Sequence, residues 1–162
     1  MGTLMVERLA EADYAQIKPL LVDLHLTEQA HYADHPQLSR FEIEDHLASI
    51  PNAFRGENVI FVARDDDGSV IGFCWVVLHD PGTGLEGEVA EVSVAPAHRG
   101  HGVGEVLIEQ AVRLFRERGV TLGYVWTRPD NEAAVRLYSG AGFEPNRQLV
   151  MTWYPSEPYR QT

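Results

Sequence analysis

A glycine-rich loop between a strand pattern and a helix pattern is the stretch of this chain best suited to chemistry. Residues 97–104 read Ala-His-Arg-Gly-His-Gly-Val-Gly, so an arginine and three glycines stand where a strand hands over to a helix. A helix N-terminus presents unpaired N–H groups and the positive end of the helix dipole. Glycines allow positive φ angles and let a phosphate approach the backbone closely. The loop therefore predicts a site for an anion, and specifically for a phosphate-bearing ligand.

Two familiar nucleotide motifs fail on their spacing. A dinucleotide-binding fingerprint requires a third glycine three residues after Gly102, where this chain has Glu105. A P-loop requires lysine and then serine or threonine after its last glycine, but Glu105 and Val106 follow Gly104. The phosphate site is therefore predicted to belong to another class of protein.

The spacing Arg99-x-x-Gly102-x-Gly104 resembles the pyrophosphate-binding signature of the GNAT superfamily of N-acetyltransferases, which bind acetyl-CoA. Residues 92–96, Val-Ser-Val-Ala-Pro, resemble the strand that leads into this signature. Residues 131–138, Asn-Glu-Ala-Ala-Val-Arg-Leu-Tyr, followed by Gly142 and Phe143, resemble the second conserved block of the superfamily. One block alone is a weak signal, whereas both in this order and spacing are a strong one. The resemblance rests on motifs in the second half of the chain and only on pattern before it.

The resemblance implies a binding strip for acetyl-CoA along the central strand and the loop. Val94 acts there through its main chain, because the central strand of this superfamily diverges from its neighbour and leaves N–H groups free. Arg99 supplies a counter-charge, and Asn131 a hydrogen bond to the pantetheine. The alternative for Val92 and Val94 is plain packing in the core. The alternative for Arg99 is a surface arginine, and that for Asn131 is the cap of its helix. The expected cofactor-binding residues are Val92, Val94, Arg99, Gly100, His101, Gly102, Val103, Gly104, Asn131 and Tyr138.

Acetyl transfer from a thioester to an amine requires a neutral amine, stabilisation of the carbonyl oxygen and a proton for the departing thiolate. Tyr138 matches the usual general acid of the superfamily, and a phenol with a pKa near ~10 is protonated at neutral pH. Asn131 lies seven residues earlier, about two helical turns or roughly 10 Å along the axis, so both can face one groove. The alternative for Tyr138 is packing in the core.

Glu88 and Glu91 are the candidate general bases, because a charged side chain in an otherwise apolar strand costs free energy unless it is solvated or paired. The resemblance favours Glu88, since the base of several relatives lies six residues before the position of Val94. Regular alternation puts Glu88 on the same side as Val92 and Val94, and Glu91 on the other, unless a bulge reverses this. A water chain, or an exposed edge position for either glutamate, is the alternative.

Aromatic residues are candidates to line the acceptor pocket. Tyr124 and Trp126 alternate on one face of their strand, and Trp75 lies in a neighbouring strand. Aromatic faces suit a cationic amine. Core packing is the alternative for each of them.

Hydrophobic periodicity predicts the elements that position these residues. Residues 103–118 form an amphipathic helix, and helices are also predicted at 13–28, delayed or kinked by Pro19, at about 40–50 after the Ser39 cap, and at about 131–139. The predicted strands are 3–9, 58–64, 70–79, 88–94, 120–127 and 147–154, with a hairpin at 65–68. Cys74 reads as a buried hydrophobe. His25, His31 and His35 lie in or beside a polar loop without metal-ligand spacing, so no metal is expected.

The 162 residues fit one domain, predicted to span residues 1–155, with residues 156–162 as a loose tail or a dimer arm. A formal net charge of −11 argues against nucleic acid and anionic membranes as partners and favours a cationic substrate. The first ten residues lack the pattern of a signal peptide and no run is long enough to span a membrane, so a cytoplasmic protein is expected.

These observations predict an α/β protein, α+β mixed, of GNAT type, with a mixed and mainly antiparallel sheet of six to seven strands flanked by about four helices. The expected function is transfer of acetyl from acetyl-CoA to a primary amine of a small molecule or peptide, by direct attack in a ternary complex. A non-catalytic acyl-CoA-binding regulatory module and a protein N-terminal acetyltransferase are the alternatives. The oligomeric state, including a homodimer, is left open.

Overall fold

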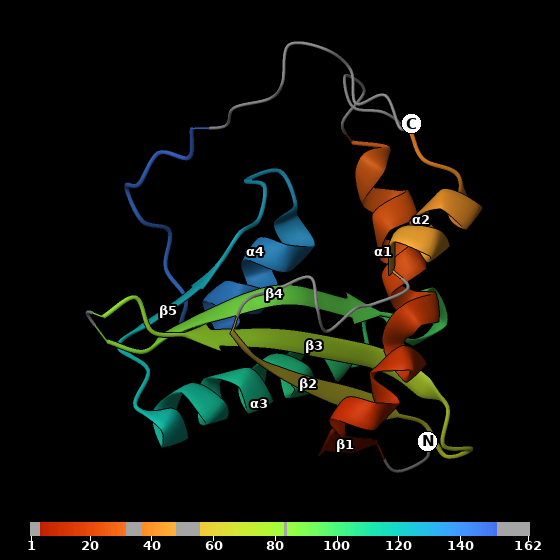
Figure 1. Cartoon of the computed structure of the whole chain (residues 1–162), viewed down its shortest axis with the longest axis horizontal. Helices are drawn as coiled ribbons and strands as arrows, with labels where there is room; N and C mark the ends of the chain where they lie inside the picture. Colours follow the sequence, from red (N-terminus) through yellow and green to blue (C-terminus); the bar gives the residue numbers. More distant parts are fainter. Residues whose placement is uncertain (1–3, 32–36, 48–55, 83, 152–162) are drawn as a thin grey trace.

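A five-stranded mixed sheet forms the centre of the computed structural model, which describes residues 4–31, 37–47, 56–82 and 84–151 (Figure 1). The strands are β1 (Met5–Arg8), β2 (Glu57–Arg64), β3 (Val70–His79), β4 (Glu86–Val94) and β5 (Leu122–Val125). They lie in the order β1-β2-β3-β4-β5, antiparallel except for the parallel pair β4 and β5. The predicted mixed, mainly antiparallel sheet is confirmed.

Helices cover both faces of this sheet. α3 (Val103–Arg118) packs on one face, while the 3-10 helix η1 (Glu11–Ile17), α1 (Lys18–Gln29) and α2 (Arg40–His46) lie on the other (Figure 1). α4 (Glu132–Gly140) lies near the N-terminal part of α3, on the side of β5. Each face therefore has its own apolar core, and β3 contributes alternate residues to both.

The helix predicted at residues 103–118 is α3, with the same bounds. It begins after Gly102, with φ of 81°, and ends at Gly119, with φ of 68°, so a left-handed glycine stands at each end. Phe115 packs on β4 and β5 where Gly87 and Gly123 leave room, because a Cβ at Gly87 would stand 2.3 Å from the ring. This contact fixes α3 against the parallel pair of strands.

One extra residue interrupts the pairing of β3 with β4. Trp75 lies opposite Glu91, but the next residue, Val76, lies opposite Val89, so Ala90 has no partner in the register. Two residues on one strand facing one on the other is a β-bulge, which reverses the alternation of side chains beyond it. The bulge decides which faces Glu88 and Glu91, the candidate bases, occupy.

The first helical region differs from the prediction in how it starts. Residues 11–17 form the 3-10 helix, and α1 begins only at Lys18, with Pro19 in its first turn. The predicted delay at Pro19 is confirmed, because proline lacks the N–H that a helix interior needs. The predicted cap at Asp13 is wrong, since no side chain caps η1 or α1. The cap at Ser39 is confirmed, with the reciprocal bonds between Ser39 and Glu42.

The sheet has fewer strands than predicted over the described residues. β1, β2, β3 and the hairpin at 65–68 are close to the prediction, whereas β5 is shorter than residues 120–127. Residues 147–151 form no strand, which corrects the predicted strand at 147–154 over its described part. The remaining residues of that prediction, and the predicted tail at 156–162, lie outside the described residues. Within the described ranges, no helix is both long and apolar enough to cross a membrane.

Candidate active site

The N-terminus of α3 presents a row of backbone donors. Val106 is the first residue of this helix whose N–H bonds within it, to the carbonyl of Gly102. Among the described residues, the N–H groups of residues 100–105 have no backbone acceptor. A Cβ built on Gly100 or Gly102 meets no atom within 4 Å, so the space above the loop is open. Residues 100–105, called the amide loop below, therefore present the backbone donors that a phosphate site needs. Binding of a pyrophosphate there stays a prediction.

The side chain of Arg99 does not reach into this loop, where the sequence analysis expected it to supply a counter-charge. Its exposed side chain turns back along the chain, and its Nε donates to the carbonyl of Val94 at 2.9 Å. The guanidinium therefore spans from the end of β4 to the start of the loop. Its charge remains beside the amide loop, while its Nε supports the carbonyl of Val94.

The edge of β4 facing β5 is open beyond Val89, the last residue of β4 that pairs with β5. The amide of Ala95 donates to the carbonyl of Ile71 on β3, so Ala95 and Ile71 form a hydrogen-bonded pair. In an antiparallel ladder such pairs alternate, which turns the main-chain groups of Val92 and Val94 away from β3 and toward the open edge. This is the divergence that the resemblance implied for the main chain of Val94.

Both candidate bases of β4, Glu88 and Glu91, lie on the face covered by α1. Glu88 is opposite Val77 and Glu91 is opposite Trp75, and both of these partners belong to the core beneath η1 and α1. Val92 and Val94 pack on the opposite core, beneath α3. The expectation that Glu88 shares the side of Val92 and Val94 is therefore wrong, because the bulge at Ala90 reverses the alternation between them.

The two glutamates have different surroundings. Burial raises the pKa of Glu91 to about 7, and the neighbouring carboxylates of Glu28 and Glu88 add to this rise. Tyr124 is the partner residue of Glu88 on β5, and its pKa is raised by burial and, to a smaller extent, by the charges of Glu88 and Glu86. A carboxylate with a pKa near neutrality is suited to take up and release a proton at neutral pH.

Tyr138 is a half-buried residue of α4 that packs against the core beneath α3, with its ring 6.0 Å from that of Phe143. Burial raises its pKa, and the nearby Cys74, Glu91 and Glu28 add to the rise. The phenol is therefore protonated at neutral pH, as a general acid must be. The packing and the acid roles are compatible in this position.

Asn131 caps α4, because its Oδ1 accepts from the N–H of Ala134 at 3.2 Å. The cap is the alternative that the sequence analysis left open. The cap uses the side-chain oxygen, so it does not occupy the side-chain N–H groups of Asn131. Binding of the pantetheine by these N–H groups stays a prediction.

The aromatic candidates separate into core and surface. Trp75 is 2% exposed, and its indole donates to Oδ1 of Asn58 at 2.8 Å, so it is a core residue. Tyr124 is half-buried and meets Trp126 edge to face, with ring centroids 6.3 Å apart. Trp126 is 60% exposed. Tyr124 and Trp126 are therefore the aromatic residues that an acceptor could contact.

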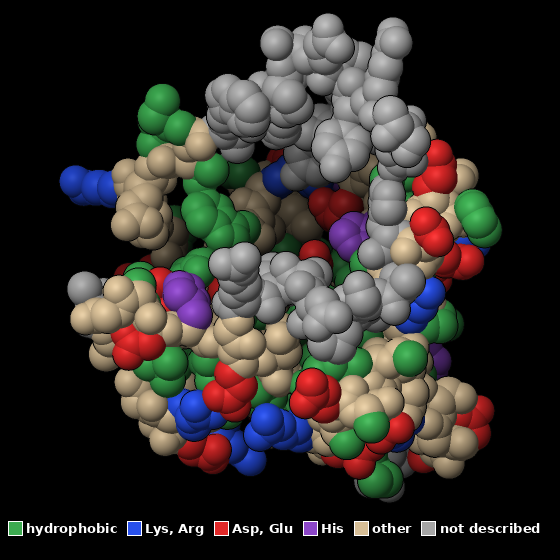
Figure 2. Space-filling view, in the orientation of Figure 1, with side chains coloured by type: hydrophobic (Ala, Val, Ile, Leu, Met, Phe, Trp, Pro, Cys, Tyr) green, Lys and Arg blue, Asp and Glu red, His purple; other side chains and the backbone are tan. Residues whose placement is uncertain are grey.

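Two charged residues and a histidine, none of which sequence reasoning assigned to the site, also lie on this face. Glu28 and half-buried His25 come from α1, and Arg128 comes from the segment between β5 and α4. Arg128 Nη1 donates to Glu28 Oε2 at 3.0 Å, although one hundred residues separate them. Figure 2 shows that the molecule is hollowed between α1 and α4, with acidic and histidine side chains toward the α1 side. No local signal could have paired Glu28 with Arg128.

Residues 21–143 match the sequence model of the Acetyltransferase (GNAT) family. The chain belongs to the GNAT family. The predicted class, an acetyl-CoA-dependent N-acetyltransferase, is thereby confirmed at the level of the family, whose donor is acetyl-CoA.

Curated relatives of this GNAT-family chain include mycothiol acetyltransferases. The protein of that name from Stackebrandtia nassauensis is 35% identical over 115 residues, which cover 70% of this chain and 38% of the relative. The one from Propionibacterium freudenreichii is 30% identical over 143 residues, covering 86% and 45%. The chain thus spans less than half the length of these relatives.

Solved structures of similar fold are more distant in sequence. A putative acetyl transferase from Pyrococcus furiosus superposes with a TM-score of 0.75 at 22% identity, covering 94% of this chain and all of that one. An aminoglycoside acetyltransferase from an uncultured soil metagenomic sample, in complex with sisomicin, gives 0.63 at 16% identity, covering 95% and 97%. At these identities the similarity confirms the GNAT fold alone.

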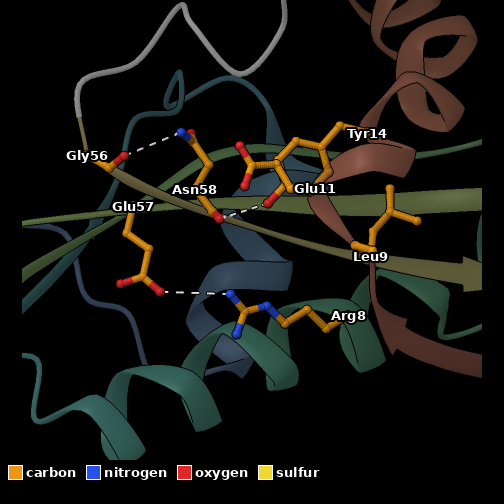
Figure 3. A pocket seen from close by; sticks show the side chains of 8 residues that line it. Arg8, Leu9, Glu11, Tyr14, Gly56, Glu57 and Asn58 are labelled. Carbon is orange, nitrogen blue, oxygen red and sulfur yellow. Dashed lines mark hydrogen bonds and ion pairs between the residues drawn. The ribbon is translucent and has the colours of Figure 1, made fainter.

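A separate cavity of about 570 Å³ lies at the other edge of the sheet, between β1, η1 and β2 (Figure 3). Tyr14 donates its hydroxyl to the carbonyl of Asn58 at 2.9 Å, and Arg8 lies 3.8 Å from Glu57. Glu57 is held more closely by Arg118 at the end of α3. None of the residues predicted for acetyl transfer lines this cavity.

Proposed function

We propose that this chain transfers an acetyl group from acetyl-CoA to an amine of a small molecule, by direct attack while both substrates are bound. The observation that carries the proposal is the row of N–H groups without a backbone acceptor at residues 100–105, which follows the strand whose edge is left open by β5 beyond Val89. Glu91 of that strand has a pKa near 7, and Tyr138 of α4 carries a protonated phenol.

Acetyl-CoA supplies an activated acetyl group as co-substrate. The amide loop binds its pyrophosphate, and the main-chain N–H groups of Val92 and Val94 hold the acyl end. Glu91, directly or through a water molecule, takes the proton from the acceptor ammonium so that the neutral amine attacks the thioester carbonyl. As the carbon–sulfur bond breaks, Tyr138 donates its proton to the thiolate.

We assign the base role to Glu91 in preference to Glu88. Desolvation, together with the charges of Glu28 and Glu88, gives Glu91 the basicity that proton transfer near pH 7 needs. Glu88 then adds negative charge where a cationic amine arrives.

A small-molecule acceptor is supported by the names of the relatives, which refer to mycothiol and, for a fold neighbour, to an aminoglycoside. The half-buried acidic groups Glu28, Glu88 and Glu91 suit an acceptor that arrives as a cation. A cationic amine of a small molecule is therefore the acceptor class we propose.

The function is tested by mixing the protein with acetyl-CoA and single amines, namely sisomicin, glucosamine, spermidine and a short peptide with a free N-terminus, and assaying free thiol. Thiol release with a small amine, falling on the acid side of about pH 7, is expected. Calorimetric CoA binding without thiol release for any amine would instead support the regulatory module. Release with the peptide alone would support an N-terminal acetyltransferase.

A further inference from the structure

The last turn of α1 carries an acidic residue where a helix favours a cation. Glu28 lies beside the C-terminal carbonyl groups of α1, which form the negative end of the helix dipole, and that turn has no basic residue of its own. The positive charge comes from Arg128, whose Nη1 bonds to Oε2 of Glu28 at 3.0 Å. A residue distant in sequence therefore completes the end of α1.

Arg128 also belongs to the entry of α4. Its carbonyl accepts from the N–H of Asn131, the N-cap of α4, and its Nε donates to Asp130 at 3.2 Å. The planar guanidinium thus joins two carboxylates with different edges, a geometry that lysine cannot reproduce. The ion pair ties the end of α1 to the start of the helix that carries Tyr138.

Glu28 acts electrostatically on the groups proposed for catalysis. Its charge contributes to the raised pKa of Glu91 and to that of Tyr138. It also opposes the lowering of the pKa of His25 by burial. The charges that act on Glu91 are those of Glu28 on α1 and Glu88 on β4, and Glu91 in turn acts on Tyr138 of α4. Arg128 bonds to Glu28 and to Asp130.

We propose that Arg128 and Glu28 are a positioning pair for acetyl transfer, which holds the end of α1 against the start of α4 and balances the charge beside Glu91. The inference rests on the proposed function in one respect, that Glu91 is the base. Neither residue of the pair exchanges a proton with the substrates. Each acts through Glu91 and through the placement of α4.

Removing the charge of Glu28 and removing the charge of Arg128 are expected to shift the pKa of Glu91 in opposite directions. In Glu28→Gln a negative charge is lost and Arg128 is left without this partner, so the pKa of Glu91 falls. In Arg128→Gln the charge of Glu28 is no longer balanced, so the pKa of Glu91 rises. Because each charge acts on Glu91 through half-buried, partly screened surroundings, each shift is expected to be roughly 0.5 unit.

The experiment measures the titration of Glu91 directly, by carbon NMR of protein labelled at the glutamate side-chain carboxyl, with the resonance assigned by its absence in Glu91→Gln. Opposite shifts in the two single variants, and a value near the parent in the double variant, are expected. Arg128→Lys keeps the charge and should keep the titration. Arg40→Gln breaks a different ion pair of α1, with Asp23, and is the matched control.

Steady-state kinetics on the amine selected by the thiol assay then give a second readout. The acid limb of kcat/KM should move with the NMR value, and Arg128→Lys should raise the KM of the acceptor because α4 loses its double anchor. Shifts in one common direction, or none beyond the Arg40→Gln control, would overturn the inference. If Glu91 titrates as expected but Glu91→Gln keeps full activity, the base assignment fails while the pair stands.

Discussion

Glu91 illustrates how a single position combines function with a cost in stability. Its pKa is near 7 in the folded chain, against 4.5 for a glutamate in water, because burial and two carboxylate neighbours disfavour the charged form. The folded state therefore binds more protons than the unfolded state between these two values. Folding is thus favoured by acid through this group, and its contribution is lost as the pH rises through about 7.

Replacement by glutamine tests this linkage. Glu91→Gln is expected to be more stable than the parent by about 1–3 kcal/mol at pH 8, and to gain much less at pH 4.5, because glutamine carries no charge to desolvate. Urea unfolding at the two pH values measures the difference. Glu109→Gln on the exposed side of α3 controls for the change in net charge. An equal effect of Glu91→Gln at both pH values would contradict the raised pKa.

Tyr138 gives a second prediction at this scale. Tyr138→Phe keeps the packing against Phe143 but removes the proton that the thiolate receives, so kcat should fall by roughly 10²-fold. The KM for acetyl-CoA should change far less. Rapid-mixing and steady-state thiol assays measure both, with Tyr14→Phe as a control that removes a hydroxyl away from the site. An unchanged kcat would remove Tyr138 from the acid role.

At the scale of the element, the two ends of α3 provide a matched pair of glycines. Gly102 and Gly119 both have positive φ, and a Cβ on either meets no neighbouring atom within 4 Å. Alanine at either position therefore strains the backbone by a similar amount, about 1 kcal/mol. Only Gly102 belongs to the amide loop.

Alanine variants of these two glycines separate an effect on stability from an effect on CoA binding. Gly102→Ala and Gly119→Ala should lower the free energy of unfolding alike, whereas only Gly102→Ala should weaken the binding of CoA, by roughly tenfold or more. Thermal unfolding and calorimetry measure the two quantities. If both variants bind CoA as the parent does, the amide loop is not the pyrophosphate site.

The helix α3 and the hairpin at 65–68 follow closely from the sequence, and the reason is local. Residues 103–118 carry a complete amphipathic period with glycine at both ends, and residues 65–68 carry a turn that needs only Gly68 in the left-handed region. The bulge at Ala90 has no such signature, because alanine suits regular and bulged strands equally. Its position is fixed by the pairing with β3, which no single segment contains.

At the scale of the whole molecule, α3 packs closely on the parallel strands because two glycines there have no side chain. The ring of Phe115 occupies the space in front of Gly87 and Gly123, where a Cβ would stand 2.3 and 2.8 Å from its atoms. This is the contact that brings the helix close to the sheet just before β4 and β5 diverge. It also positions the open edge on which the proposed site depends.

Overpacking this contact should destabilise the fold in a way that can be relieved. Gly87→Ala is expected to cost about 1–3 kcal/mol, and the double variant with Phe115→Leu to recover part of that loss. Chemical unfolding of the two single variants and the double variant gives the coupling. Strictly additive losses would show that the ring and the glycine do not compete for the same space.

The sequence by itself determined the family, the amide loop, the amphipathic helix behind it and the tyrosine of the second block, because each depends on residues close together along the chain. Tertiary structure decided the rest. The bulge that turns Glu88 and Glu91 to one face and the bond from Arg128 to Glu28 join segments far apart in sequence. The charge that any one carboxylate experiences depends on which others the fold brings near it, so the pKa of Glu91 follows only from the assembled sheet and helices.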